Sequence, residues 1–513
     1  MSNEAENKKL FWACFIALVA TSFFFGLRSV VIPDLQSQFN LSGAGIGQIL
    51  GVGLWPFAFS IIFFSLIIDK VGYKPCAYFA IIAHALAVVG TLIAIKTTNQ
   101  SMLYWSTFLV AIANGAVEGF INPVVATIYS KEKSKWLNIL HAGWPAGLAV
   151  GAAAGILLGY AEASLMLKFG VCLIPVVFYA LLTIPRKFPV QERVAAGVTY
   201  RDMLREVGAI GFFLMAWLTV MGVVQVANTL VETPIHAPLG VTLGIAAAVA
   251  IAAFLYTRSL GNGMFVIILI TMPFLATTEL GTDGWMTELL SADLKEKAGW
   301  VFVMVSVIMT ILRFYAGPIV HKFSPIGLLV VSGALAIIGL LFLGLAPASL
   351  MIVAAIVYAF GKTFLWSTTL GVVAEQFPKG GALTLNGVSG VGVLGMGILG
   401  APLMGLYLDR GVDADLSKQE PALYEKVKGD LNDGMFGESP SLKNEVVETL
   451  EGEEAEKLST IVNANKKKAF LRQAALPGFM LACYLGLFFY FKSKGGYKPV
   501  QLDGGGGGSA GGH

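Results

Sequence analysis

Four ionisable side chains lie well inside apolar runs that are long enough to cross a membrane: Arg28, Glu118, Glu279 and Lys362. A charge at bilayer depth is costly unless it faces a hydrated cavity or a partner of opposite charge. Such residues therefore mark a path for a substrate or an ion. A carboxylate there can also carry a proton, because burial without a cation favours its neutral form and hydration favours its charged form.

The composition is that of an integral membrane protein. Hydrophobic residues make up 56% of the 513 residues and charged residues only 13%, which is about half the charged share of an average soluble chain. The formal net charge is only +3, so nothing points to nucleic acid as a partner. Four cysteines lie in or beside apolar runs and are interpreted as small buried residues. We predict no metal site, no cofactor and no enzymatic activity.

Fourteen apolar runs can each span the hydrocarbon layer as a helix. Six runs come first, a polar basic linker over residues 186–206 follows, and two further runs precede the last six. The runs lie near residues 10–32, 44–69, 74–96, 101–129, 136–160, 164–185, 208–231, 239–257, 263–290, 298–318, 325–345, 349–375, 383–409 and 471–491.

Lysine and arginine concentrate in the short loops on one side of these runs, as at Lys8, Lys131 and Arg186, and are sparse on the other side. Because short cytoplasmic loops carry the excess of positive charge, we predict a multi-pass protein of a bacterial-type inner membrane with both termini cytoplasmic. The long loop over 410–470 is then extracytoplasmic. It is acidic and helix-prone, and we expect a solvated helical cap. A partner-docking or gating element is the alternative.

Two short loops share a motif. The first copy follows the second run and contains Asp69, Lys70, Gly72 and Lys74. The second copy, over 317–325, contains His321 and Lys322. Both resemble the G-x-x-x-D-(R/K)-x-G-(R/K) signature of the major facilitator superfamily, which lies between the second and third helices of each six-helix bundle. The resemblance implies a gating motif, in which the acidic side chain binds basic residues across the bundle interface and latches the outward-open state.

A second repeat relates the two halves of the chain. A leucine followed by Asn138 recurs as a leucine followed by Asn386, each after a short charged loop. On this register Glu118 corresponds to Trp366. Internal repeats are expected when a substrate binds near mid-membrane between two bundles.

A closer resemblance, over about the first 160 residues, is to the fucose/galactose/glucose–proton symporters of that superfamily. The segments that carry it are residues 31–39, 118–124 and 137–138. In that family the glutamate and asparagine of the fourth helix line the sugar site, and the glutamate takes part in proton coupling. The resemblance implies these roles for Glu118 and Asn122.

We therefore predict an all-α polytopic membrane protein with the major facilitator fold, built of two pseudo-symmetric six-helix bundles plus two additional helices. The expected units are the N-terminal bundle (1–185), the linker with the two extra helices (186–262), helices seven to eleven of the bundles (263–409), the acidic insert (410–470), the last helix with its cytoplasmic tail (471–502) and an artificial glycine-rich linker (503–513).

The resemblance implies that the inner faces of the first, fourth, seventh and tenth helices, which carry the buried charges, line the substrate cavity. His141 and Trp144 on the fifth helix are candidates for the same cavity. Together these helices supply the predicted substrate-binding residues. They are Arg28, Glu118, Asn122, His141, Trp144, Glu279, Lys362 and Trp366. Tryptophan rings can stack on the C–H face of a sugar, while amide and carboxylate groups bind its hydroxyls. Alternatives stay open for several of them. Each tryptophan can instead be a core or interface residue, and Lys362 can bind either an anionic substrate or a carboxylate partner. Glu118 is either the coupling group or a permanent partner of Lys362 or Arg28, Arg28 can pair with Glu279 or Asp283, and His141 can be a packing residue.

The predicted function is alternating-access transport of a sugar or sugar derivative by proton-coupled symport, with sodium as the other possible coupling ion. Arg28 and Lys362 leave an acidic sugar or another organic anion open as substrate. An exporter of amphipathic compounds and a non-transporting sensor or lipid-handling protein are further alternatives. We expect a monomer in the lipid bilayer.

Overall fold

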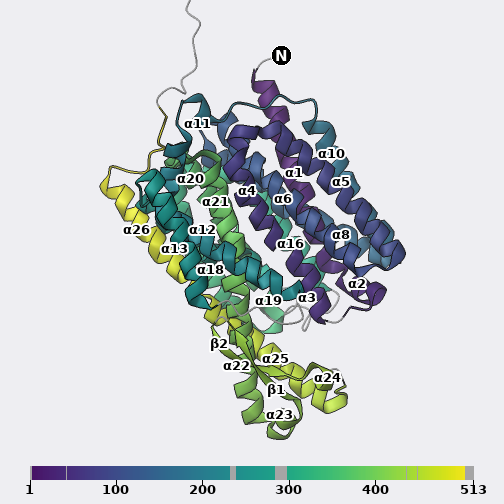
Figure 1. Cartoon of the computed structure of the whole chain (residues 1–513). Coiled ribbons are helices and arrows are strands. Elements are labelled where there is room, and N and C mark those ends of the chain that lie inside the picture. Colours follow the sequence, from purple (N-terminus) through teal and green to yellow (C-terminus); the bar gives the residue numbers. More distant parts are fainter. Residues whose placement is uncertain are drawn as a thin grey trace, which may run out of the picture.

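The computed structural model describes residues 3–41, 43–230, 238–283, 297–434, 436–447 and 449–502. Within these residues, 13 helices are long and apolar enough to cross a membrane, and a pair of helices bent by 64° brings the number to 14. Most of them run side by side through one body (Figure 1). The predicted all-α polytopic fold is therefore confirmed. Residues 284–290 of one predicted span and the linker 503–513 lie outside the described residues.

The first bundle is held together by close helix packing at small residues. A Cβ atom at Gly147 would lie 2.4 Å from the Val19 carbonyl oxygen, and one at Gly151 would lie 2.3 Å from the Phe23 oxygen. These glycines let α1 and α8 approach each other closely. The helices of this bundle are α1 (Asn3–Val30), α2 (Ile32–Phe39), α3 (Gly43–Val52), α4 (Trp55–Val71), α5 (Tyr73–Thr97), α6 (Gln100–Ile128), α7 (Lys133–His141), α8 (Gly143–Tyr160), α9 (Leu165–Gly170) and α10 (Leu173–Thr183).

The second bundle contains several interrupted helices. α14 (Gly263–Ala276) continues into a π-helical turn, η1 (Thr277–Gly281), and α21 (Gly381–Gly395) continues into another, η5 (Met396–Gly400). One span is divided between α19 (Met351–Lys362) and α20 (Leu365–Gln376). The remaining helices are α16 (Ala298–Phe314), α17 (Ala316–Phe323), α18 (Pro325–Leu345), α22 (Ala401–Gln419), α25 (Gly452–Gln473) and α26 (Ala475–Ser493), with short 3₁₀ turns η3 (Ala348–Leu350) and η4 (Pro378–Gly380).

Two further helices lie beside the bundles. The linker turn α11 (Glu192–Ala195) leads to α12 (Tyr200–Leu230) and α13 (Leu239–Thr257). α12 packs against α21 and α14, whereas α13 packs mainly on α12 and presents much of its apolar surface outward. The loop between α13 and α14 lies against α12 at Gly208, where a Cβ atom on Gly208 would lie 2.0 Å from the Gly261 nitrogen.

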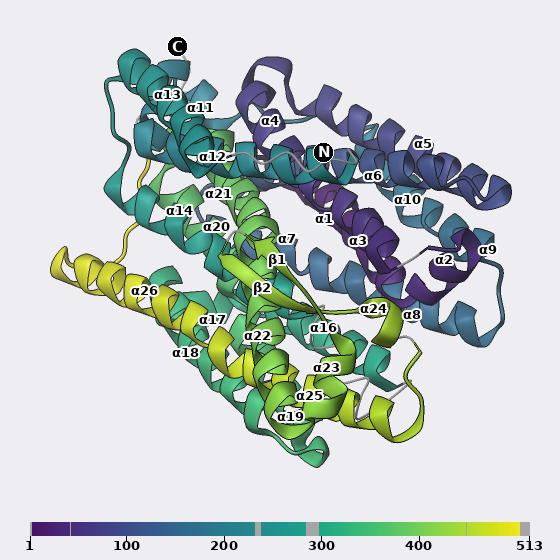
Figure 2. The same cartoon turned by 60° about the horizontal axis from the view of Figure 1, so that its bottom comes forward.

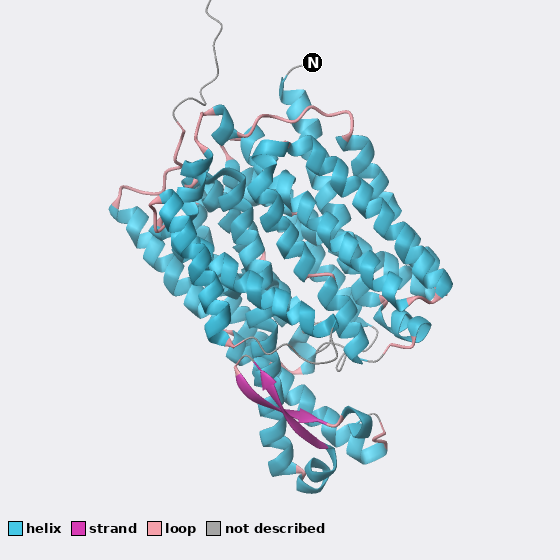
Figure 3. Ribbon diagram, in the orientation of Figure 1, coloured by secondary structure: helices cyan, strands magenta, loops and turns pink. Residues whose placement is uncertain are grey.

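The segment between the last two spans forms a small unit at the end of the bundle opposite the N-terminus (Figures 1 and 2). Its own apolar cluster contains Leu416, Leu423, Val427, Leu458 and Ile461. Helices were predicted here, but the structure adds an antiparallel hairpin of β1 (Lys428–Gly434) and β2 (Gly437–Leu442), followed by α24 (Asn444–Val447) (Figure 3). α23 (Pro421–Val427) precedes it. The Asn-, Asp- and Gly-rich sequence at the turn is the hairpin signal that the helical prediction overlooked.

Candidate functional site

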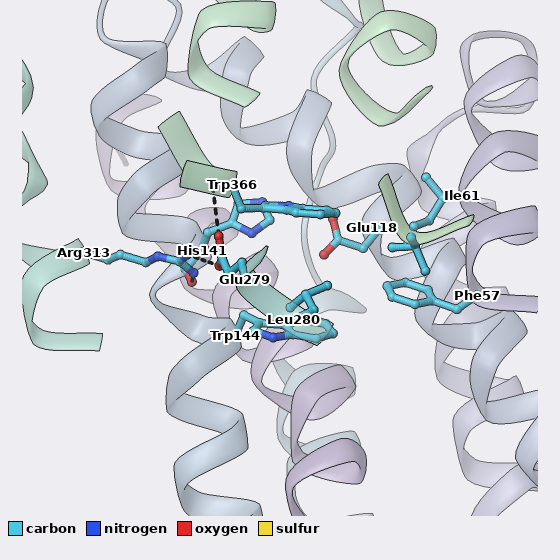
Figure 4. Close-up of a pocket in the computed structure, with 10 residues that line it drawn as sticks. Phe57, Ile61, Glu118, His141, Trp144, Glu279, Leu280, Arg313 and Trp366 are labelled. Atoms are coloured by element: carbon cyan, nitrogen blue, oxygen red, sulfur yellow. Dashed lines mark hydrogen bonds and ion pairs between the residues drawn. The ribbon is translucent and has the colours of Figure 1, made fainter. Parts of the chain in front are cut away.

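A small cavity lies between the two bundles, with an empty volume of about 360 Å³. Both bundles line it, the first through α4, α6, α7 and α8 and the second through η1, α16, α20 and α21. The lining residues are Phe57, Ile61, Glu118, His141, Trp144, Glu279, Leu280, Arg313, Trp366 and Val393 (Figure 4). Five of the eight predicted binding residues are among them.

Two tryptophans form opposite walls of the cavity. Trp366 and Trp144 face each other across it, and the Glu118 side chain extends between them (Figure 4). The ring of Phe57, which also lines the cavity, is nearly parallel to that of Trp144, with 6.2 Å between the ring centroids and an interplanar angle of 7°. The Trp144 Nε1 atom is buried and has no hydrogen-bond partner among the described residues. The cavity thus has two flat apolar faces, and its lining includes the carboxylates of Glu118 and Glu279.

Glu118 belongs to a hydrogen-bonded chain of polar side chains. Asn122 Nδ2 donates to Glu118 Oε2 at 2.7 Å and to Asn386 Oδ1 at 3.2 Å. His141 Nε2 lies 2.9 Å from Asn122 Oδ1, so it is the donor of that bond. Asn122, another of the eight predicted binding residues, does not line the cavity itself. It lies directly behind the cavity wall and joins Glu118 to His141.

The predicted ion pairs of the site are rearranged in the structure. Glu279 Oε1 accepts from Arg313 Nη2 at 2.7 Å, and Lys362 is bonded to Asp283. Neither Arg28 nor Lys362 pairs with Glu118, and Arg28 pairs with neither Glu279 nor Asp283. The alternative of a permanent ion pair at Glu118 is therefore not found within the described part of the chain.

Arg28 and Lys362 do not line the cavity. The Arg28 guanidinium packs against the backbone of Gly53 and lies 5.3 Å from the Phe25 ring centroid. Lys362 is fully buried, and its Nζ lies 5.6 Å from the Tyr358 ring centroid. The sequence predicts how far along its helix each of these residues lies. It does not predict the direction in which the side chain points around the helix, and that direction keeps both side chains out of the cavity.

The second repeat places equivalent asparagines in reciprocal positions. Asn138 on α7 accepts from Ser367 Oγ on α20 at 2.6 Å. Asn386 on α21 donates from Nδ2 to the Gly119 carbonyl on α6 at 2.9 Å. Each asparagine thus crosses from its own bundle to the other one. The repeated sequence corresponds to a pseudo-symmetric pair of contacts beside the cavity.

The sequence comparison with family models matches the Major Facilitator Superfamily over residues 14–290. The chain belongs to this superfamily. A comparison with curated proteins finds no match.

Several solved transporters share the major facilitator fold of this chain. The Escherichia coli fucose:proton symporter FucP is 13% identical, with 94% of this chain and 99% of that chain covered and a TM-score of 0.57. The human organic anion transporter MFSD10 is 12% identical, with 93% and 99% covered and a TM-score of 0.59. The proton:xylose symporter XylE is 13% identical, with 81% and 91% covered and a TM-score of 0.57. At these identities the likeness shows the fold alone.

The first copy of the motif is bound to the linker. Asp69 accepts from Arg193 Nε at 3.0 Å, and both side chains are buried. The expected partner was a basic residue of the opposite bundle, whereas Arg193 belongs to α11. Lys70 Nζ lies 4.4 Å from the Tyr200 ring centroid on α12. The motif therefore fixes the linker, and its Gly72 supplies the positive φ of 91° at the turn.

The remaining motif residues lie closer to the surface. Lys74 Nζ is 5.6 Å from the Tyr78 ring centroid, and Lys322 Nζ is 5.7 Å from that of Phe323. His321 Nε2 lies 3.3 Å from Glu132 Oε1. Because Glu132 precedes α7, this second copy of the motif does reach across to the first bundle.

Arg313 is the charged cavity residue that the sequence prediction missed; the other lining residues that were not predicted are apolar. It lies on α16 near the end of the run predicted over 298–318, and its side chain is only 1% exposed. The rule that selected the other four charges, namely an ionisable residue inside an apolar run, would have selected it too.

Proposed function

We propose that this protein is a secondary active transporter that moves a neutral sugar or sugar derivative by alternating access, in symport with a proton carried by Glu118. The observation that supports this most is the Glu118 carboxylate, which has no cationic partner among the described residues and lies between two facing tryptophans at the interface of the bundles. Stacking faces and a few directed polar groups suit a sugar ring.

The charge balance of the cavity favours a neutral substrate over an anion. Arg313 is neutralised by Glu279, and Lys362 is bonded to Asp283 away from the cavity. The carboxylate of Glu118 would repel a second negative charge in this low-dielectric space. Two of the similar structures, FucP and XylE, are proton symporters of fucose and xylose, while MFSD10 is an organic anion transporter. Organic anions are therefore the competing substrate class.

Uptake by the purified protein in proteoliposomes tests the proposal. We expect an imposed pH gradient, alkaline inside, to drive accumulation of at least one radiolabelled neutral sugar above its external concentration. A protonophore should abolish that accumulation, and a sodium gradient should not replace the pH gradient. Accumulation of acidic sugars alone, or of no sugar across a broad panel, would refute the proposal.

We further propose that both termini lie in the cytoplasm. Basic residues gather in the short loops at the end of the bundle where α1 begins, as at Lys70, Lys74, Lys131 and Lys135. A fluorescent protein that matures only in the cytoplasm, fused after residue 502, should fluoresce in whole cells. A dark but fully expressed fusion would reverse this orientation.

A further inference from the structure

Three interruptions of helical backbone converge beside the cavity. α7 ends at His141 because residue 145, which would donate to the His141 carbonyl in a continuous helix, is Pro145 and has no N–H. The span of α19 and α20 is broken at residues 363–364, which frees the Thr363 carbonyl. η1 presents Glu279 from a π-helical turn. Backbone groups freed in this way need partners inside the protein.

One guanidinium group supplies a donor to all three interruptions. Arg313 Nη1 donates to the His141 carbonyl at 2.8 Å, Nε donates to the Thr363 carbonyl at 2.7 Å, and Nη2 donates to Glu279 Oε1 at 2.7 Å. The first acceptor belongs to the N-terminal bundle and the other two to the C-terminal bundle. A planar fork of fixed N–H directions can hold three acceptors in one geometry, which the single ammonium of a lysine cannot reproduce.

We propose that Arg313 is a positioning residue that sets the gap between Trp144 and Trp366. Each tryptophan follows a carbonyl held by Arg313 by three residues, or about one helical turn. Glu279 also restrains Trp366, because its Oε2 accepts a hydrogen bond from the Trp366 backbone N–H at 3.1 Å. The guanidinium thus fixes the start of both helical segments that carry the walls of the cavity.

This inference rests on the proposed function in one respect, which is that the gap between the tryptophans is the substrate slot. All three donors named above point to protein acceptors, so the role of Arg313 is indirect. Its substitution should therefore change how well substrate fits. If Arg313 served only to balance the charge of Glu279, both residues could be replaced together by neutral ones without changing substrate affinity.

The test compares Arg313→Lys with a matched control, Arg186→Lys. Arg186 also donates to a carbonyl and a carboxylate, Leu182 O at 3.2 Å and Glu6 Oε2 at 3.0 Å, but it lies after α10. We expect Arg313→Lys to raise the KM for sugar uptake about tenfold or more while the folded fraction still transports. The Arg186→Lys protein should keep the wild-type KM. An unchanged KM in Arg313→Lys overturns the inference.

A second readout needs no substrate. A cysteine at the cavity-lining position, Leu280→Cys in a Cys483→Ala background, is labelled with a maleimide; the other three native cysteines are buried. Arg313→Lys should change the labelling rate severalfold, whereas Arg186→Lys should not. An unchanged rate overturns the inference even if no sugar is transported, so its failure is distinct from failure of the proposed function.

A double variant covers the case in which Arg313→Lys does not fold. The double variant Arg313→Met with Glu279→Gln has no unpaired charge at this position, but it also lacks the guanidinium group that donates to the three acceptors. We expect it to fold and to keep the raised KM and the altered Leu280→Cys labelling. Recovery of the wild-type KM and labelling rate in this double variant would show that Arg313 serves charge balance alone, and would overturn a positioning role.

Discussion

At the residue scale, the two carboxylates of the cavity have opposite surroundings. Glu279 accepts from a guanidinium and from a backbone N–H, so its negative charge is fully compensated. Glu118 accepts from the neutral amide of Asn122, and the nearby cations are bonded to other carboxylates. A buried carboxylate without a cation gains or loses a proton as its hydration changes. Glu118 is therefore suited to coupling and Glu279 to a fixed structural pair.

Replacing Glu118 with Gln tests this difference. The amide keeps the shape of the side chain and can still bind Asn122, but it cannot release a proton. We expect Glu118→Gln to abolish pH-driven accumulation in proteoliposomes while exchange of labelled for unlabelled sugar continues. Glu279→Gln is the control, because it leaves Arg313 buried without a counter-charge and should lower the free energy of unfolding by about 3–5 kcal/mol. Full accumulation by Glu118→Gln would contradict its coupling role.

Substitution of Lys362 tests whether its ammonium group binds an anionic substrate. Its ammonium is bonded to Asp283 and does not line the cavity, so Lys362→Met should act on stability. We expect thermal unfolding of the solubilised protein to show a loss of about 3 kcal/mol, as for other broken buried pairs. The double variant Lys362→Met with Asp283→Asn should recover part of that loss, because the effects of substitutions at two residues in contact on the free energy of unfolding are not additive. If Lys362→Met instead abolishes binding of an acidic sugar at unchanged stability, the anion alternative is favoured.

At the scale of single elements, the two π-helical turns of the second bundle pack directly on each other. A Cβ atom at Gly400 of η5 would lie 1.9 Å from Thr277 Oγ1 of η1, and the Thr277 hydroxyl itself donates to the Pro273 carbonyl at 2.7 Å. Thr277 therefore leaves no room for a side chain at residue 400. This contact joins α14 to α21, two of the helices that extend towards the insert.

Gly400→Ala should consequently be destabilising, although alanine is normally the better helix former. Overpacking of a tight contact costs about 1–3 kcal/mol. Gly397→Ala is a matched control in the same turn, because a Cβ atom there meets no atom within 4 Å. We expect thermal unfolding to occur at a lower temperature for Gly400→Ala and at an equal or higher one for Gly397→Ala. Equal stability of the two variants would show that the turns separate easily.

The sequence predicted the spans well and their interruptions poorly. An apolar run of sufficient length must be a helix in the membrane, whatever its neighbours are. The break at residues 363–364 depends instead on a distant partner, Arg313, which satisfies the freed carbonyl. Likewise Lys362 and Trp366 lie one turn apart on either side of that break, and only the fold decides that Trp366 lines the cavity and Lys362 does not.

At the scale of the whole molecule, the two bundles are closed against each other near Glu375, at the C-terminal end of α20. Glu375 Oε1 accepts from the Ser134 N–H in the first turn of α7 at 2.8 Å. A carboxylate is stabilised at a helix N-terminus by the helix dipole and the free N–H groups. Oε2 accepts from the Tyr497 hydroxyl at 2.8 Å. One side chain therefore joins the first bundle, the second bundle and the segment after α26.

The segment after α26 is attached to α20 by further bonds. The Val500 N–H donates to the Glu375 carbonyl at 2.8 Å, and Gln376 Nε2 donates to the Lys498 carbonyl at 2.9 Å. On the other side of the contact, Lys133 bonds both Glu192 of the linker, at 2.5 Å, and the Ala374 carbonyl, at 3.2 Å. An alternating-access transporter must break the bond between Glu375 and Ser134 whenever this end opens.

Weakening this contact should make opening at this end more frequent. A hydrogen bond to a charged group contributes about 1.5–3 kcal/mol, so Glu375→Gln should increase the open population about tenfold or more. Tyr497→Phe removes only the bond from the segment after α26 and should have a smaller effect in the same direction. Tyr490→Phe is the matched control, since no hydrogen bond of its exposed hydroxyl to another described residue is found.

Alkylation of a cysteine at position 126 measures the opening. Ala126 is 7% exposed and lines a cleft between α6, the linker and the end of α20, so reagent reaches it when the bundles separate there. We expect labelling of Ala126→Cys to accelerate in the order Tyr490→Phe, Tyr497→Phe, Glu375→Gln. Equal labelling in all three backgrounds would mean that the bond between Glu375 and α7 does not control opening, and that the linker contact of Lys133 holds the bundles together without it.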